Sequence, residues 1–414
     1  MKYIEQRFTF IGFQFLLINF FILDLLSSII STQRIIYEII KILFGLILWI
    51  LILVDYKINK PNIKNHIGSI NFKKLIAILL FFILILSVSL LYSRNTGYGI
   101  FKLFNFLIGA VPVLFGFYYL LITINRSRIN IFFISVIIES IIFLILILLI
   151  NPFHYDGQKI ITLTRWSHVI FEHFIGPLYF LFFFMLIKSR DKRELLFYSA
   201  GLTISIIGVY ISGARAAFTG LIFFTPLILL LSLWKKELNS KNSIFFFTAI
   251  IFSIFIIYVL QPYSETVNSR YISLFDISKP DIGDASVNAR ITGLEISQEI
   301  FKKHPFTGVG FGGYKNYKGI HLTYLIEYPH NIFVEFLIEL GIPGLIYFLF
   351  LLYIIFISTK RISLFMTIFF CFALWLALFS KSISSNTLLW LGLAFYGLDD
   401  SAVKKLKTLF KDNE

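Results

Sequence analysis

The segment LIAILLFFILILSVSLLY, residues 75–92, contains no charged side chain. Its length matches the roughly 18 or more apolar residues that a helix needs to cross a hydrocarbon core of about 30 Å. Because no water reaches backbone groups inside a bilayer, such a segment is expected to be helical. We expect about twelve spans of this kind, at residues 8–30, 35–54, 75–92, 104–124, 131–150, 169–187, 195–212, 216–234, 244–260, 333–357, 362–380 and 383–398.

The composition of the whole chain supports the same class. Of its 414 residues, 58% are hydrophobic and 14% are charged, and the mean hydropathy is +0.84. Soluble globular domains carry about 25% charged residues. These values exclude an ordinary soluble domain and predict an all-α polytopic membrane protein.

The net charge of +14 has a distribution that predicts orientation. Lysines and arginines concentrate in alternate short segments, which include Lys57, Lys60, Lys64 and the cluster at residues 188–193. Since short cytoplasmic loops are enriched in these residues, we expect both termini to be cytoplasmic. The positive charge then faces anionic membrane lipid, and no nucleic-acid partner is expected.

This orientation divides the chain into four parts. Residues 1–260 hold the first nine spans, and residues 261–331 form one large extracytoplasmic (periplasmic) loop. Residues 332–400 hold the last three spans, and residues 401–414 form a basic cytoplasmic tail. The loop carries as many acidic as basic residues, so it is not a nucleic-acid patch.

Three stretches on the expected outer face carry polar groups. The first is SGARAAF, residues 212–218, a tight turn between two spans that presents Arg215. An arginine at this depth either extends its side chain to lipid headgroups or belongs to a ligand site. The stretch alone leaves both interpretations open.

The second stretch is DASVNARITGLEISQEIFKKHPFTGVGFGGY, residues 284–314. Asp284 or Ser286 is expected to cap an amphipathic helix that lies on the outer surface and ends before Pro305. Arg290 falls near the start of this helix, where the positive end of the helix dipole favours an anion. Helical spacing predicts an apolar face made of Val287, Ile291, Leu294 and Ile300 or Phe301.

A glycine-rich turn, GVGFGG at residues 308–313, follows the helix. A glycine backbone can approach a phosphate closely, which makes Gly308 and Gly310 candidates for substrate binding. No strand is expected before the turn and no Lys-Ser or Lys-Thr pair follows it, so neither a dinucleotide fingerprint nor a P-loop is present. A flexible turn is the alternative.

The third stretch is YPHNIFVEFLIELGIPG, residues 328–344. Asn331 is expected to cap the tenth span. The preceding His330 is disfavoured as a cation at a helix start, so it is expected to be neutral and able to accept a proton. Glu335 and Glu339 are too polar for lipid and must face a cavity or another helix. A helix break is expected at residues 341–344.

The last two stretches, from NARITGLEISQEIFKKHPFTGVGFGGY to YPHNIFVEFLIELGIPGLIYFLFLLY, resemble the C-terminal signature of the O-antigen ligase family, which also includes O-antigen polymerases. The shared pattern is an arginine-bearing helix, a Pro-x-x-Gly-x-Gly-x-Gly turn, a spacer, and then His-Asn, an acidic residue and Gly-x-x-Gly. SGARAAF resembles the Ser-x-Arg turn of that family. Elsewhere only the hydropathy is similar.

The resemblance implies a GT-C-like glycosyltransferase of the bacterial inner membrane that needs no cofactor and no metal. The donor would be a glycan on undecaprenyl pyrophosphate, and the acceptor a glycan or the lipid A-core. Arg215 and Arg290 would bind the pyrophosphate as catalytic residues, and His330 would be the base that activates the acceptor hydroxyl. The expected substrate-binding residues are Asn331, Gly308, Gly310, Tyr328, Glu335 and Arg165.

One region departs from the family pattern. The stretch TRWSHVIFEHFIGPLYF, residues 164–180, stands near the sixth span in place of the Asn-Pro-Asn-like stretch of many ligases. This difference weakens the ligase, the expected function, against the polymerase as its alternative. Its polar side chains form either a second wall of the site or an interfacial belt with Trp166. They are Arg165, His168, Glu172 and His173.

A transporter or flippase for lipid-linked sugars is the alternative from a different class. It would place charged residues in the middle of broken spans, and the candidates are Glu139, Asp24 and Glu172. Polar groups in this chain gather on one face instead, which favours chemistry at the outer leaflet. A metal site in the large loop is a further alternative to solvated carboxylates, and its candidates are Asp276, Asp281 and Asp284.

Overall fold

The computed structural model describes residues 34–123, 134, 138, 167–235, 237–261, 285–317, 328–379 and 382–410, and every regular element in them is helical. Within this part, 6 helices are long and apolar enough to cross a membrane. They are Ile70–Tyr92, Thr96–Thr123, Lys192–Ser212, Arg215–Trp234, Ser240–Leu260 and Ile332–Lys360. An all-helical protein with several spans is confirmed, whereas the count of twelve and the large outer loop stay predictions.

Each expected span that falls within the described residues is helical. The span expected at 8–30 and most of the one at 131–150 lie outside them. The span expected at 104–124 begins earlier, at Thr96, because a helical turn precedes the apolar run. Some spans contain shorter apolar helices, namely Gly45–Val54, Ile175–Lys188, Leu364–Ala377 and Thr387–Tyr396.

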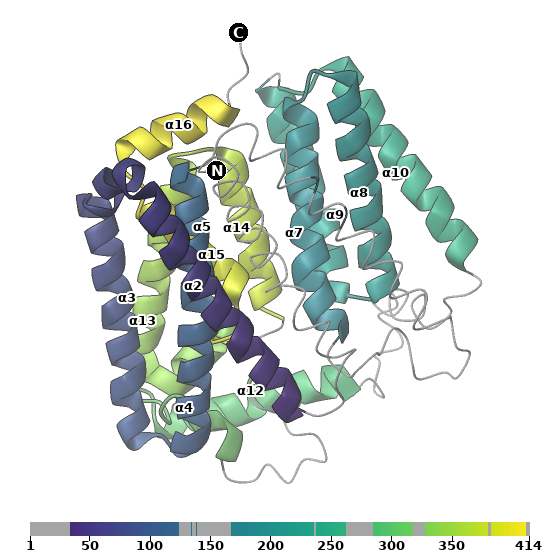
Figure 1. Cartoon of the computed structure of the whole chain (residues 1–414). Helices are drawn as coiled ribbons and strands as arrows, with labels where there is room; N and C mark the ends of the chain where they lie inside the picture. Colours follow the sequence, from purple (N-terminus) through teal and green to yellow (C-terminus); the bar gives the residue numbers. More distant parts are fainter. Residues whose placement is uncertain are drawn as a thin grey trace.

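The long helices run between two ends of the molecule (Figure 1). One group contains α2 (Arg34–Ile67), α3 (Ile70–Ser89), α4 (Thr96–Asn105), α5 (Val111–Thr123), α13 (Ile332–Lys360), α14 (Leu364–Ala377) and α15 (Thr387–Tyr396). A second group contains α7 (Ser167–Lys188), α8 (Lys192–Ser212), α9 (Arg215–Trp234) and α10 (Ser240–Leu260). Helix α14 contacts α13 in the first group and α7 and α9 in the second, so it joins the two.

Aromatic rings fill the interior of the first group. The ring centroid of Phe82 on α3 lies 5.4 Å from that of Phe106, 5.9 Å from that of Phe336 and 5.5 Å from that of Trp390. Aromatic pairs at such distances add to the free energy gained by burying their area. Helices α3, α13 and α15 therefore meet around Phe82.

Large apolar side chains also cover the outside of the bundle. Leu84 of α3, Phe255 of α10 and Ile346 of α13 are 56%, 60% and 61% exposed. Extended apolar surface is unfavourable in water, whereas lipid tails solvate it. This exposure is consistent with helices that face a bilayer.

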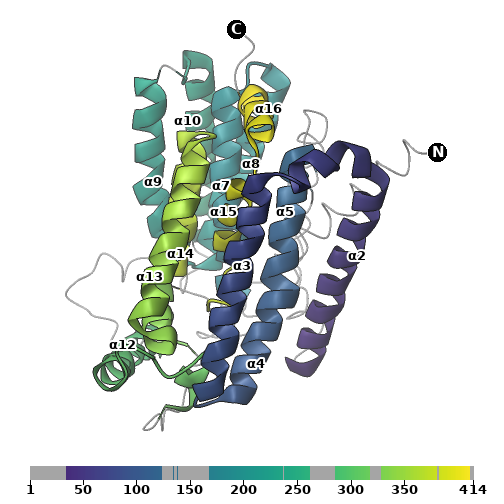
Figure 2. The same ribbon diagram turned by 90° about the vertical axis from the view of Figure 1, so that its left-hand side faces the viewer.

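Two shorter helices lie across the ends of the bundle. Helix α12 (Ala285–Lys303) lies at the end where α13 begins, and α16 (Asp400–Phe410) lies at the opposite end (Figures 1 and 2). Asp400 is 2.7 Å from Arg361, and Asp399 is 2.7 Å from His66, which fastens α16 to the bundle. Exposed basic residues gather near the α16 end, namely Lys64, Lys73, Lys74, Arg190, Lys192 and Arg193. This distribution agrees with a cytoplasmic α16 end, which stays a prediction.

Helix α12 contacts the rest of the protein through only part of its expected apolar face. Of the expected apolar face, Ile291 and Leu294 are 51% and 50% exposed, whereas Ile300 is buried. The residues that pack inward are Gly293, Ser297 and Ile300. Two small residues therefore make much of the contact between α12 and the rest of the protein, and the membrane-facing position of the apolar face stays a prediction.

Candidate functional site

Helix α13 begins with a side-chain cap, as predicted. The side-chain oxygen of Asn331 accepts hydrogen bonds from the backbone N–H groups of Phe333 at 3.0 Å and Val334 at 3.2 Å. These N–H groups belong to the first turn of the helix and have no intrahelical acceptor. The cap therefore fixes the direction in which the chain passes from His330 into the helix.

His330 has a backbone conformation that few residues adopt. Its φ of 56° lies in the left-handed region, which is uncommon for residues other than glycine. Such a conformation costs of order 1–3 kcal/mol and persists where the surroundings impose it, often at functional sites. The ring of Tyr328 lies against the imidazole, with ring centroids 4.3 Å apart.

Arg290 of α12 acts electrostatically on His330. Burial, and after it the positive charge of Arg290, lowers the pKa of His330 to about 4. Helix α12 contacts the segment before α13, because a Cβ built on Gly293 would lie 3.8 Å from the Cα of Pro329. This contact brings Arg290 near His330. Arg290 is one turn from Gly293 on the same helix. We therefore expect the imidazole to be neutral at physiological pH, with the positive charge of Arg290 acting on it.

Helix α13 is interrupted at Gly341, as predicted for residues 341–344. The φ of 71° and ψ of −171° at Gly341 are not helical. Pro343 has no N–H group, and the N–H of Ile342 donates to the carbonyl of Pro305 at 2.9 Å instead of to its own helix. Two carbonyls one turn earlier therefore lose their usual donors.

The glycine-rich turn supplies the missing donors. The N–H of Val309 donates to the carbonyl of Ile338 at 2.8 Å, and the N–H of Gly310 donates to the carbonyl of Glu339 at 2.9 Å. In a membrane an unbonded carbonyl is costly, so these bonds make the helix break tolerable. The turn is a structural part of α13, although it lies before it in the chain.

Left-handed glycines make this docking possible. The φ angles of Gly308, Gly310 and Gly312 are 65°, 80° and 78°. A Cβ on Gly308 would lie 2.6 Å from the carbonyl oxygens of both Ile338 and Glu339. The N–H groups of Gly308 and Gly310 both donate to protein carbonyls. These contacts explain the turn without a ligand, and the assignment of both glycines to substrate binding stays a prediction.

The other side of the turn is bonded to the junction between α3 and α4. The hydroxyl of Ser93 donates to the carbonyl of Phe311 at 2.9 Å, and the hydroxyl of Ser89 accepts from the N–H of Phe311 at 3.3 Å. The N–H of Arg94 donates to the carbonyl of Val309 at 3.2 Å. The turn therefore joins α13 to α3 and α4.

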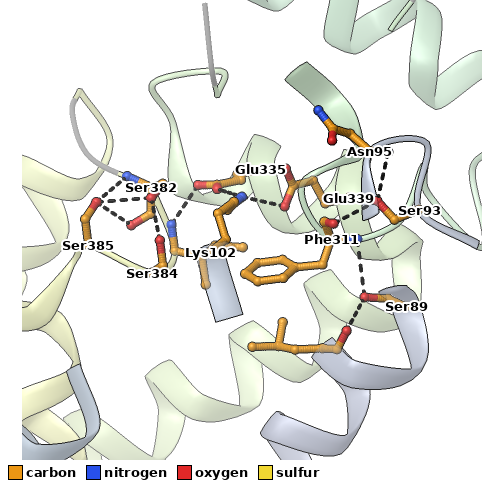
Figure 3. A network of polar contacts seen from close by, with 12 residues as sticks. Ser89, Ser93, Asn95, Lys102, Phe311, Glu335, Glu339, Ser382, Ser384 and Ser385 are labelled. Atoms are coloured by element: carbon orange, nitrogen blue, oxygen red, sulfur yellow. Dashed lines mark hydrogen bonds and ion pairs between the residues drawn. The ribbon is translucent and has the colours of Figure 1, made fainter. Parts of the chain in front are cut away.

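A buried ammonium group lies next to this turn (Figure 3). The Nζ of Lys102 on α4 donates to Glu335 Oε1 at 2.6 Å and to Glu339 Oε2 at 2.7 Å, and all three side chains are at most 2% exposed. Glu335 Oε2 accepts from the N–H of Ile383 at 2.9 Å. The ammonium also lies 4.5 Å from the ring centre of Phe311. Such bonds compensate the charges for the loss of water.

The sequence predicted that Glu335 and Glu339 face a cavity or another helix, and the partner is α4. It did not identify Lys102, because the expected span began at residue 104 and left this lysine in an outer segment. Two carboxylates inside a span require a nearby cation, and this requirement could have led to Lys102. Substrate binding by Glu335 stays a prediction, since both of its oxygens are bonded within the protein.

Arg215 begins α9 at the same end of the bundle as α12 (Figure 1). The turn before it contains Gly213, whose φ is 61° and whose N–H donates to the carbonyl of Tyr210 at 3.0 Å. The indole N–H of Trp375 donates to the carbonyl of Ala216 at 2.9 Å. Arg215 is therefore held on a turn that is fastened to α14, and its presence in one site with Arg290 stays a prediction.

Several predicted residues lie outside the described residues. They are Arg165, Trp166, Asp24, Glu139, Asp276, Asp281 and Asp284, together with the side chains of His168, Glu172, His173, Ser286 and Val287. In the part of the chain that the structure describes, no group of three or more His, Cys, Asp and Glu side chains is arranged to hold a metal ion. The second polar wall and the loop metal site remain hypotheses.

Comparison with known proteins bears on the same segments. Residues 200–349 match the family model described as O-antigen ligase. This range includes Arg215, Arg290, the glycine-rich turn and His330, and it leaves out Lys102 and Ile383. The resemblance noted from the sequence is confirmed over this range. A comparison with curated proteins finds no match.

Proposed function

Since residues 200–349 match the O-antigen ligase family, a family of glycosyltransferase enzymes, we propose that this protein transfers a glycan from an undecaprenyl-pyrophosphate donor to an acceptor hydroxyl. The transfer takes place at the outer face of the bacterial inner membrane and needs no metal ion. The observation that carries the proposal is the half-buried imidazole of His330, whose strained backbone leads into α13 and whose pKa is lowered by desolvation and by the positive charge of Arg290.

Arg290 and Arg215 bind the pyrophosphate of the donor. As the bond between the sugar and the pyrophosphate breaks, negative charge develops on the leaving group, and fixed guanidinium groups stabilise it. Helix α12 exposes Ile291 and Leu294 beside Arg290. This surface offers apolar contact to the prenyl chain next to the group that binds its phosphate.

His330 removes the proton of the acceptor hydroxyl. A bond forms between the acceptor oxygen and the anomeric carbon, while the bond from that carbon to the pyrophosphate oxygen breaks. The acceptor proton passes to the imidazole, and undecaprenyl pyrophosphate leaves with the electron pair. A positioned general base of this kind typically contributes about 10²–10⁴-fold to the rate.

Donor binding prepares His330 for this role. A base whose pKa is about 4 accepts protons weakly at neutral pH. A bound pyrophosphate offsets the positive charge of Arg290, which is one of the two causes of the lowered pKa. The pKa of His330 therefore rises when the donor is in place, so the base becomes effective in the complex that reacts.

The variant His330→Ala tests the proposal. With purified protein, lipid-linked donor and acceptor, transfer should fall by about 10²–10⁴-fold. Binding of the donor should persist, because both arginines remain. The variant His304→Ala, which removes an imidazole that is hydrogen-bonded to Arg94 and is not assigned to the site, serves as the matched control and should retain most of the activity. A correctly folded His330→Ala protein with near-normal transfer would disprove the proposed role.

The acceptor distinguishes a ligase from a polymerase of the same family. The ligase is the first candidate and the polymerase the alternative, and the absence of an Asn-Pro-Asn-like stretch in residues 164–180 weakens the ligase against the polymerase. Mass spectrometry of surface glycans from a deletion strain separates the two. Glycans that lose their attachment indicate a ligase, whereas attached glycans that lose chain length indicate a polymerase.

A further inference from the structure

We propose that Lys102, Glu335 and Glu339 form a positioning network for His330, in which Glu335 is the decisive member. The proposal rests on the proposed function, because it concerns the same base. All three side chains are buried, so they act through the helix that follows His330 rather than on the substrate.

The outer part of α13 needs such a network because it is separated from the rest of the helix. The break at Gly341 leaves residues 332–340 as a piece of less than three turns. The carbonyls of Ile338 and Glu339, which would otherwise accept hydrogen bonds from the rest of α13, accept them from the glycine-rich turn. Its orientation, and with it that of His330, is therefore set by contacts with neighbouring segments.

Lys102 holds this piece at two points. Glu335 and Glu339 are four residues apart, so they project from the same face of the helix, one turn from each other. The ammonium of Lys102 is bonded to both carboxylates, at 2.6 and 2.7 Å. Two bonds along one face fix both the rotation of the piece about its axis and its position along that axis.

Glu335 makes a further connection that Glu339 lacks. Its second oxygen accepts from the N–H of Ile383, and the carbonyl of Ile383 accepts from the indole N–H of Trp390 on α15 at 2.8 Å. Glu335 is also the nearer of the two carboxylates to His330 along the chain. It therefore ties the start of α13 to α4 and to α15.

The two glutamates provide a matched pair of isosteric variants. Both oxygens of Glu335 face donors, so a Gln side chain must turn its NH₂ group toward either Lys102 or the N–H of Ile383. Glu339 Oε1 has no hydrogen-bond partner among the described residues, so a Gln at 339 can place its NH₂ there without opposing a donor. Each substitution removes one negative charge, and only Glu335→Gln disrupts the hydrogen bonds.

The kinetic test measures kcat, KM for the donor and the pH–rate profile of the two full-length variants. We expect Glu335→Gln to lower kcat by about 10²-fold, since a displacement of about 1 Å in a catalytic group costs this much. The KM for the donor should remain near the wild-type value, and the acid limb of the pH–rate profile should shift. Glu339→Gln should stay close to the wild-type rate and profile.

A second measurement does not depend on activity. In a Cys371→Ser background, which removes the single native cysteine, a cysteine is introduced by Ser385→Cys in the segment that Glu335 holds. We expect the cysteine at position 385 to react faster with a thiol reagent when the protein also carries Glu335→Gln. Its rate of reaction should not change when the protein carries Glu339→Gln instead.

The outcomes separate the two proposals. Equal loss of kcat in both variants would show that charge alone matters and would overturn the positioning role of Glu335. A Glu335→Gln protein with wild-type kcat, pH profile and thiol reactivity would overturn it as well. Wild-type protein that transfers no glycan, with the expected difference in thiol reactivity, would leave the network standing and reject the proposed function.

Discussion

Replacement of Gly308 by alanine tests whether the glycine-rich turn is a structural part of α13. Gly308 has a φ of 65°, and a Cβ added there would lie 2.6 Å from the carbonyl oxygens of Ile338 and Glu339. These are the carbonyls that accept from the N–H groups of Val309 and Gly310. The methyl group therefore acts as a wedge between the turn and the helix that it completes.

Two effects add in this variant. An alanine in the left-handed region costs about 1–2 kcal/mol. Displacement of the turn also leaves two buried carbonyls without donors, at about 1–3 kcal/mol each. The total of about 3–8 kcal/mol is a large part of the 5–15 kcal/mol that stabilises a typical protein. We expect poor accumulation of the folded protein and a markedly lower unfolding temperature.

The assay is the fraction of protein that remains monodisperse in detergent after heating, which gives an apparent Tm. We expect Gly308→Ala to lower it by at least about 5 °C. Gly97→Ala is the matched control, because Gly97 is exposed in α4 and a Cβ there would meet nothing nearer than Asn95 Oδ1 at 4.0 Å. Similar Tm values for both variants would refute the reasoning.

Other predictions concern the chemistry and the topology. When the pH is lowered through about 4, kcat/KM should fall, because protonation of His330 in the free enzyme removes the base. The value of kcat should fall at a higher pH, because bound donor raises the pKa of His330. Arg290→Ala should weaken donor binding and move the limb of kcat/KM to higher pH, since loss of the guanidinium raises the pKa of His330. Excess EDTA should leave transfer unchanged, and rescue of lost activity by Mg²⁺ or Mn²⁺ would contradict this. Lys102→Met leaves two buried carboxylates without a cation and should destabilise the protein by about 3–5 kcal/mol in a thermal assay. A cysteine introduced by Lys318→Cys in the Cys371→Ser background should react with membrane-impermeant thiol reagents in intact cells whose outer membrane, if present, has been made permeable. Reaction only after lysis of the inner membrane would reverse the proposed topology.

The features that the sequence predicted correctly depend on local signals. Apolar runs predicted the helices, because lipid requires internal backbone bonding. Asn331 predicted the cap of α13, and Gly341 with Pro343 predicted its break, because these residue types have few conformational or bonding alternatives. His330 was identified as neutral from its place at a helix start, and the structure adds burial and Arg290 as the causes.

The features that the sequence missed depend on contacts between distant segments. Lys102 and Glu335 are 233 residues apart, and nothing near either residue indicates their pairing. The contact of α12 with the rest of the protein was not identified, because Gly293 and Ser297 pack by being small rather than apolar. The glycine-rich turn was weighed as a phosphate loop or a flexible connection, since its bonds to α13 follow from the tertiary structure alone.

The dependence of α13 on the glycine-rich turn has a consequence for biosynthesis. The turn precedes α13 in the chain, so it leaves the ribosome first. In the predicted topology it also crosses the membrane first, and its N–H groups are in place at the outer surface before the carbonyls of Ile338 and Glu339 arrive. In the reverse order, the insertion machinery would release a broken helix with two unbonded carbonyls into lipid, at several kcal/mol each. In this topology, the direction of translation delivers the hydrogen-bond donors of the turn before the carbonyls that need them.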